Sequence, residues 1–154
     1  MLINQLKEDL IKAQKEKDIL FVSVLRFLLA EINNVASSKY PPSAGGIPAN
    51  GLPDEDIISV LQKQVKTHHE SIEAFGKGNR QDLVDKEKAE LVILQKYLPE
   101  QMTGEEIRKI VEEVKASGIS DFGQVMKEVM GRVKGKADGG MVSKIVRELT
   151  NDNR

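Results

Sequence analysis

Residues 121–149, DFGQVMKEVMGRVKGKADGGMVSKIVREL, predict two short amphipathic helices joined by a glycine-rich loop. Gly135 suits the end of the first helix, and Asp138 is placed to cap the second. The first helix has one continuous apolar stripe, formed by Phe122, Val125, Met126, Val129, Met130 and Val133. After the loop, helical spacing resumes with Met141, Val142, Ile145, Val146 and Leu149.

The corner between these two helices carries a local excess of positive charge. From Gly131 to Arg147 the only acid is Asp138, whose side chain is expected to cap a helix. Cations beside backbone N–H groups at a helix start suit an anion such as phosphate. Solvated lysines and ordinary turn glycines would give the same pattern, so both interpretations stay open. The residues assigned to RNA phosphates are Arg132, Lys134, Gly135, Lys136, Gly139, Lys144 and Arg147.

Several segments resemble the YqeY family. Residues 121–127 (DFGQVMK) and 133–139 (VKGKADG) are similar to its C-terminal signature, which is shared with the tail domain of GatB. GatB is the B subunit of the glutamine-dependent aminoacyl-tRNA amidotransferase. The resemblance continues upstream through 70–75 (ESIEAF), 79–84 (NRQDLV) and 91–99 (LVILQKYLP), and so covers nearly the whole chain. It implies an all-helical, two-part protein akin to the tRNA-associated tail of the amidotransferase.

Three features depart from the family pattern. Gly131 stands where members usually have a proline, so we expect a looser exit from that helix. The stretch Thr67-His68-His69 is less basic than usual, which weakens the expectation of a second cationic surface. The loop from Tyr40 to Leu52 is longer than expected for the family, so no role is carried over to it.

Composition and charge limit the classes of function. The 154 residues are 40% hydrophobic and 31% charged, with a net charge of −1, which argues against a protein that coats DNA through bulk charge. The absence of cysteine excludes disulfides and thiol catalysis, and we expect a cytoplasmic protein. The longest apolar stretch, Ile19 to Ala30, is expected to be too short to span a bilayer, and the N-terminus does not resemble a signal peptide.

Apolar periodicity predicts four helices before residue 99, at about 2–17, 19–38, 54–75 and 79–98. Asp18 is expected to break or cap the first helix, and Asn79 to cap the fourth. The second helix is expected to bury Phe21, Leu25, Leu28, Ile32 and Val35, with a partner-binding face as the alternative. On the third helix, spacings of three and four residues predict a bundle seam at Ile58, Leu61, Val65, His68, Ile72 and Phe75.

Proline and glycine mark the expected boundaries between parts. Residues 40–53 hold four of the five prolines and are predicted to be a flexible loop without a regular element. Beyond Pro99, Thr103 and Glu106 form the pattern of a capping box, which opens a helix expected to end at Gly118. The predicted fold is all-α, with an N-terminal antiparallel helical bundle at 1–98 and a C-terminal three-helix domain at 99–154.

No catalytic residue, metal site or cofactor site is predicted. A metal site at His69 and Glu73 would need a third ligand, for which the sequence supplies no motif. His68 is expected to be a partly buried, hydrogen-bonded histidine on the seam. The carboxylates of Asp82, Asp85 and Glu87 alternate with lysines, as on a solvated face.

The leading hypothesis is a non-catalytic module that binds or accompanies tRNA or another structured RNA. The resemblance carries the family label of a carbon–nitrogen ligase with glutamine as amido donor, but the sequence offers no counterpart of the ligase active site. Because Phe122 is expected in the apolar stripe and no aromatic follows it, recognition would read the RNA backbone rather than stack on bases. The alternatives are an adaptor that docks an acidic surface of an amidotransferase or synthetase, and an amide-forming ligase in its own right.

Overall fold

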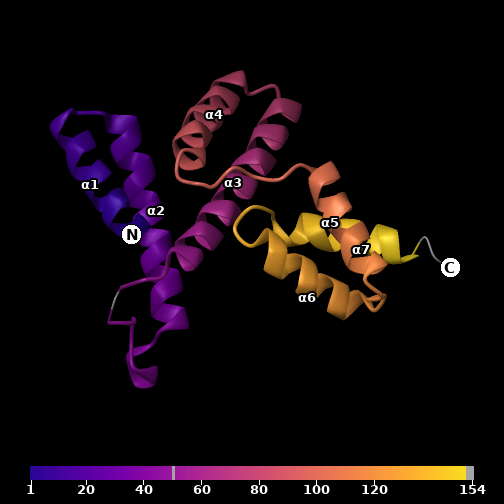
Figure 1. The fold of residues 1–154 in the computed structure, drawn as a ribbon. Coiled ribbons are helices and arrows are strands. Elements are labelled where there is room, and N and C mark those ends of the chain that lie inside the picture. The colour runs from indigo at the N-terminus through magenta and orange to yellow at the C-terminus, as the bar shows by residue number, and fades with distance from the viewer. Residues whose placement is uncertain (50, 152–154) are drawn as a thin grey trace. The chain divides into compact units, whose positions relative to one another are not determined.

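The structure, a computed structural model, describes residues 1–49 and 51–151 and consists of helices joined by turns (Figure 1). The described residues contain no strand, and the predicted all-α class is confirmed. The chain divides into two compact units, Met1–Leu98 and Pro99–Arg154, each with its own hydrophobic core. The elements are α1 (Leu2–Lys15), α2 (Ile19–Lys39), the 3-10 turn η1 (Pro42–Ala44), α3 (Asp54–Lys77), α4 (Gln81–Gln95), α5 (Gly104–Ala116), α6 (Phe122–Val133) and α7 (Gly139–Asn151).

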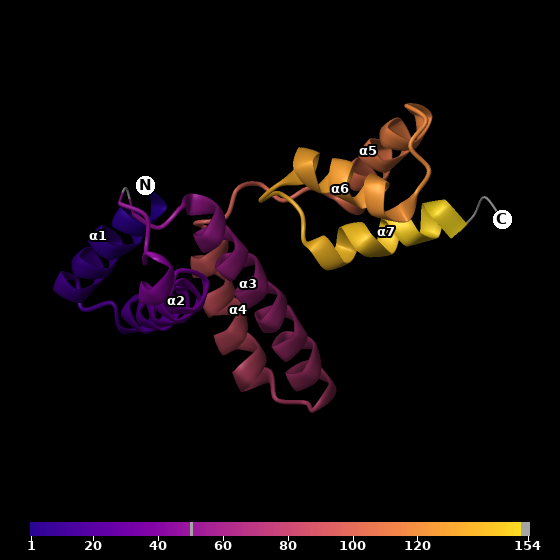
Figure 2. The ribbon, with the colours of Figure 1, turned by 90° about the horizontal axis from the view of Figure 1, so that it is seen from below.

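The first unit is built from two helical hairpins. Residues 16–18 reverse the chain between α1 and α2, and Asp18 caps α2 by accepting a hydrogen bond from the Phe21 N–H at 3.1 Å. Helices α3 and α4 lie side by side in both views, and α2 packs on both of them (Figure 1 and Figure 2). The fully buried side chains at the centre of this unit are Leu6, Leu25, Leu28, Ile32, Ile57, Leu61 and Leu94.

Helix α2 buries a narrower face than its sequence predicts. Val35 is 39% exposed, because Ala36 rather than Val35 continues the four-residue spacing of the buried stripe. Phe27, which lies outside this buried stripe, is 60% exposed. By length and composition alone, α2 would suffice to cross a membrane, a test that the core helices of globular proteins also pass. The expectation that this apolar segment is too short to span a bilayer was therefore wrong, because the helix that contains it continues to Lys39.

The connections of the first unit correct three expectations. Residues 40–53 do contain a regular element, because η1 forms there and the Gly46 N–H bonds to the Pro41 carbonyl. Asn79 does not cap α4; it adopts a φ of 56°, and the flanking residue is Arg80, which makes no side-chain cap. An asparagine tolerates that left-handed conformation, which ends the turn after α3. Helix α4 then stops at Gln95, three residues earlier than the sequence indicates.

The seam of α3 also differs from the predicted set. Its amino-terminal half buries Ile57, Val60, Leu61 and Gln64, whereas Ile58 is only half-buried. The reason is that α1, α2 and α4 all contact α3, which widens the covered face beyond one stripe. His68 lies where the spacing places it, half-buried between α3 and α4.

The second unit is a three-helix domain in which each helix contacts the other two. The predicted capping box is present, since Thr103 Oγ1 accepts from the Glu106 N–H and Glu106 Oε2 accepts from the Thr103 N–H. Asp121 caps α6 through the Gln124 N–H at 3.1 Å. The fully buried side chains of its core are Ile107, Val111, Val114, Val125, Val129, Val133, Val142 and Val146.

Phe122 is the exception in the predicted stripe of α6. It is 38% exposed and does not belong to the core of the second unit. It occupies the first turn of the helix, one turn before the buried Val125, and the guanidinium of Arg147 lies 5.9 Å from its ring centroid. The placement of Phe122 in the apolar core was therefore wrong.

Candidate functional site

The α6–α7 loop, residues 134–138, is fastened to the segment that leads into α5. Gly135 has a φ of 76°, as expected of a glycine that ends a helix, and its carbonyl accepts from Gln101 Nε2 at 3.0 Å. The Lys136 carbonyl accepts from the Met102 N–H at 2.7 Å. Because two backbone carbonyls of the loop are held in this way, its lysine side chains project from a fixed backbone.

The start of α7 has the predicted cap. Asp138 Oδ2 accepts from the Met141 N–H at 3.3 Å, so its carboxylate is used at the helix start. Gly139 is the first residue of α7, and a Cβ added there would lie 3.8 Å from Met130 Cε, an ordinary contact. Gly139 is therefore not required by close packing at this point.

The cations of the predicted RNA surface differ in whether nearby carboxylates balance their charge. Lys134 and Lys136 are exposed on the loop, and Lys144 and Arg147 are exposed one turn apart on α7. Arg132 is different, because its guanidinium lies 3.4 Å from Glu128 and 3.5 Å from Glu113. Its charge is already partly balanced by two carboxylates.

The charge around the loop is mixed on one side. A hollow next to Arg132 and Lys136 is also lined by Glu100 and Glu106, which lower its positive potential. Along the sequence, residues 122–151 carry six cations and three acids. Each of those acids has a partner, since Glu128 faces Arg132, Glu148 faces Arg108 at 3.1 Å and Asp138 caps α7. Besides Arg132, the exposed cations of this segment are Lys127 on α6, Lys134 and Lys136 on the loop, and Lys144 and Arg147 on α7.

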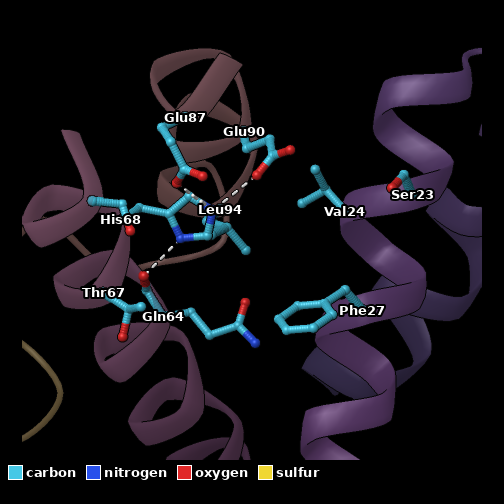
Figure 3. A pocket seen from close by; sticks show the side chains of 10 residues that line it. Ser23, Val24, Phe27, Gln64, Thr67, His68, Glu87, Glu90 and Leu94 are labelled. Atoms are coloured by element: carbon cyan, nitrogen blue, oxygen red, sulfur yellow. Dashed lines mark hydrogen bonds and ion pairs between the residues drawn. The ribbon is translucent and has the colours of Figure 1, made fainter. Parts of the chain in front are cut away.

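A second candidate site lies in the first unit, where three ionisable side chains converge between α3 and α4 (Figure 3). His68 Nε2 is 3.1 Å from Glu90 Oε2 and 3.6 Å from Glu87 Oε2. On its other side, His68 Nδ1 lies 2.8 Å from the carbonyl oxygen of Gln64, one helical turn earlier. The expected half-buried and hydrogen-bonded histidine is confirmed.

These side chains line a pocket of about 300 Å³ between α2, α3 and α4. Phe27 forms part of its wall from α2, and Gln64 reaches into it from α3 (Figure 3). Gln64 is 8% exposed, and its Nε2 has no hydrogen-bond partner among the described residues. A buried amide N–H without an acceptor costs free energy, which marks this pocket as a place that suits a bound polar group.

The pair weighed as metal ligands from the sequence, His69 and Glu73, which was set aside for want of a third ligand, does not belong to this cluster. His69 is exposed, and Glu73 pairs with Lys77 at 3.1 Å. Asp82 pairs with Arg80 at 3.1 Å, and the hydrogen bonds from Arg80 hold the pKa of that carboxyl below its usual value despite the opposing effect of desolvation. The expected solvated position of Glu87 was wrong, because Glu87 and Glu90 are three residues apart and both face His68 from α4.

Comparison with known protein families shows which family the chain belongs to. The sequence pattern of the family described as Yqey-like protein matches residues 3–150. The chain belongs to the YqeY family. The match includes both units and the C-terminal signature through which the family is related to the tail of GatB.

Curated relatives of this YqeY-family chain come from fungi. It is 35% identical to altered inheritance of mitochondria protein 41, mitochondrial, of Pyrenophora tritici-repentis, over 97% of this chain and 81% of that protein. A protein of the same name from Saccharomyces cerevisiae strain YJM789 is 26% identical over 88% of this chain and 71% of its own length. An uncharacterized protein of Schizosaccharomyces pombe is 33% identical over 56% of this chain and 61% of its own length.

These names correct one expectation about the YqeY-family chain. The absence of cysteine led to the prediction of a cytoplasmic protein, but relatives that cover most of the chain are named as mitochondrial. Cysteine content reports a reducing environment, which several compartments share, and so it could not separate them.

Proposed function

We propose that this YqeY-family protein is a non-catalytic module that binds structured RNA such as tRNA through its second unit. The observation that carries the proposal is the segregation of charge, with exposed cations on the α6–α7 loop and on one face of α7. Phosphate contacts dominate the affinity of proteins for nucleic acid, and clustered lysines supply them without any enzymatic chemistry. The relation of the family to the tail of the tRNA-dependent amidotransferase supports the same proposal.

The structure changes which residues we assign to the contact. Lys134, Lys136 and Lys144 contact phosphates, and Gly135 allows the loop backbone to turn beneath them. Arg132 is assigned a supporting role, because Glu113 and Glu128 already neutralise it. Its pair with Glu113 joins α6 to α5, and its pair with Glu128 lies within α6.

Arg147 was expected on this surface, but its contact with the exposed Phe122 ring was not foreseen from the sequence. The Arg147 guanidinium lies 5.9 Å from the Phe122 ring centroid, a cation–π distance, and both side chains are exposed, so an unpaired base or a ribose at the edge of a folded RNA can pack on them. The expectation that base stacking plays no part is therefore withdrawn for this one position.

Charge reversal tests the proposal directly. Lys134→Glu combined with Lys136→Glu should weaken binding of the purified chain to total tRNA about tenfold or more, and should lower the slope of log affinity against log salt by about two. The matched control is Lys109→Glu combined with Lys127→Glu, the same charge change at two exposed helix positions outside the loop. The control should keep most of the affinity.

The same experiment separates the RNA module from the alternative of a protein adaptor. If the loop variant and the control lose affinity equally, the interaction is nonspecific and the loop is not the RNA site. If the wild-type chain binds no tRNA at low salt, the RNA proposal fails and the adaptor becomes the better proposal. The mixed charge of Glu100, Glu106, Arg132 and Lys136 around one hollow is the observation that favours that alternative.

A further inference from the structure

The side chains of His68, Glu87 and Glu90 bring three atoms together that can each donate an electron pair to a cation. The Gln64 carbonyl can only accept a hydrogen bond, so His68 Nδ1 must be the protonated nitrogen that donates to it at 2.8 Å. His68 Nε2 then faces two carboxylate oxygens at 3.1 and 3.6 Å. Nε2 and the two carboxylate oxygens are all electron-pair donors, so the three atoms can ligate one cation together.

The distances fit a metal ion at that position. The three ligand atoms all lie within 4.8 Å of one another. For Zn²⁺ with ligand bonds of about 2.0 to 2.2 Å, tetrahedral geometry places neighbouring ligand atoms about 3.4 Å apart. The two separations measured from His68 Nε2, 3.1 and 3.6 Å, lie on either side of that value. These two separations therefore match the spacing of ligands around one ion.

The second coordination layer is also in place. Metal-bound histidines usually donate their other ring N–H to a carbonyl or carboxylate, which fixes the ring and the tautomer. The bond from His68 Nδ1 to the Gln64 carbonyl is of this kind. All three ligands are held on regular helices and are only 13% to 21% exposed, which limits the motion of their side chains.

A further observation comes from Gln64, which lies one helical turn before His68 on α3. The Gln64 side chain reaches into the same pocket, and its buried Nε2 lacks an acceptor among the described residues (Figure 3). Three protein ligands leave one position of a tetrahedral ion open, where water or another oxygen ligand binds. Gln64 therefore adds a buried, unsatisfied polar group to the same pocket, beside that open position.

We propose that His68, Glu87 and Glu90 form a binding site for a divalent transition-metal ion, with Zn²⁺ as the best match. Two carboxylates and a neutral imidazole bring a formal charge of −2, which a divalent ion neutralises inside a partly buried pocket. The single nitrogen and two oxygens favour Zn²⁺, Co²⁺ or Mn²⁺ over Ca²⁺, which takes six to eight oxygen ligands. This site lies in the first unit and is separate from the RNA surface proposed for the second.

The test measures metal binding by the full-length chain without an affinity tag. After treatment with chelator, the wild-type protein should bind one Zn²⁺ per chain by isothermal titration calorimetry. Co²⁺ should give a visible absorption band of tetrahedral intensity that Zn²⁺ removes. Zn²⁺ should also raise the midpoint of thermal unfolding, because an ion that binds only the folded state stabilises it.

Variants identify the ligands. His68→Gln and Glu90→Gln should each weaken Zn²⁺ binding about a hundredfold or more and abolish the Co²⁺ band. Glu87→Gln is nearly isosteric and 21% exposed, so it serves as a folded variant that removes a ligand if another variant unfolds. The matched control is His69→Gln combined with Glu73→Gln, which removes an adjacent histidine and a glutamate from the exposed face of α3.

The outcomes are distinct. Loss of binding in the three ligand variants, with binding kept in the control, supports the site. Absence of stoichiometric binding in the wild type overturns it and leaves the cluster as hydrogen-bonded side chains only. Equal binding by the wild type and the folded Glu87→Gln variant also overturns it, since the ion would then bind elsewhere. RNA affinity is measured on the same proteins, so failure of this site is distinguishable from failure of the RNA proposal.

Discussion

Asp56 is a buried carboxylate that fastens the loop between α2 and α3 to the first turn of α3. It is 8% exposed, forms an ion pair with Lys39 Nζ and accepts a hydrogen bond from Tyr40 Oη at 2.6 Å. Burial raises the pKa of Asp56, but the hydrogen bonds from Lys39 and Tyr40 and the charge of Lys39 lower it more, so the pKa falls below its ordinary value of 3.8. The ionised form is therefore stabilised by folding.

Substitution of Asp56 should lower stability in a pH-dependent way. Asp56→Asn removes the charge but keeps the shape, and we expect a loss of about 2 kcal/mol in the free energy of unfolding near neutral pH. Because the folded pKa is depressed, the contribution of Asp56 is fully present above pH 3.8 and is lost as pH falls through the lower folded value. Urea unfolding near neutral pH and at strongly acidic pH measures both effects. An equal difference between the two proteins at both pH values would contradict this role.

Gly135 is required by its backbone conformation. Its φ of 76° is unfavourable for a residue with a Cβ, so Gly135→Ala should cost about 1 kcal/mol of unfolding free energy. The control is Gly131→Ala, because Gly131 lies within α6, where nothing occupies the space around an added Cβ. Alanine there should stabilise the helix by up to about 1 kcal/mol. Thermal unfolding of the two variants should therefore shift in opposite directions.

At the residue scale, helix caps were easier to predict from the sequence than contacts between side chains on different helices. Asp18, Asp121 and Asp138 cap helices, and the cap at Asp138 was foreseen because capping depends on residues close in sequence. The convergence of His68 with Glu87 and Glu90 was missed, since it depends on how α3 and α4 pack. A contact between helices cannot be derived from the period of either helix alone.

The capping box of α5 is an element-scale feature that the sequence predicted fully. Thr103 and Glu106 satisfy two N–H groups at the start of α5, which is a short helix that needs such support. Thr103→Ala should lower the stability of the second unit by about 1 kcal/mol. Ser59→Ala is the control, because the Ser59 hydroxyl bonds to the Glu55 carbonyl within α3 and alanine favours a helix interior. Chemical unfolding should show a loss for Thr103→Ala alone.

Helix existence was easier to predict than helix faces. The seven helices follow from apolar spacing, proline and caps, but the buried face of α2 was assigned to Val35 instead of Ala36. Small residues such as alanine give little hydrophobic signal, although they allow close approach of a neighbouring helix. Phe122 illustrates the reverse case, since a strongly apolar residue in the first turn of α6 remains on the surface.

At the scale of the whole molecule, the chain has two cores with no shared residue among those described. Leu28 is fully buried in the first core, and Leu28→Ala should destabilise that unit by about 2 to 5 kcal/mol. Hydrogen exchange resolved along the chain should show faster exchange in α1–α4, with α5–α7 unchanged. Equal acceleration in both units would show that they unfold as one cooperative body.

The measurement that most directly tests RNA binding by the second unit is hydrogen exchange of the full chain with and without total tRNA. We predict protection in residues 131–147, which include the α6–α7 loop and most of α7, and no change in α3 and α4. The Lys134→Glu and Lys136→Glu variant should lose that protection, whereas the Lys109→Glu and Lys127→Glu control should keep it. Protection confined to the first unit, or none under conditions where tRNA binds, would contradict the proposed RNA surface.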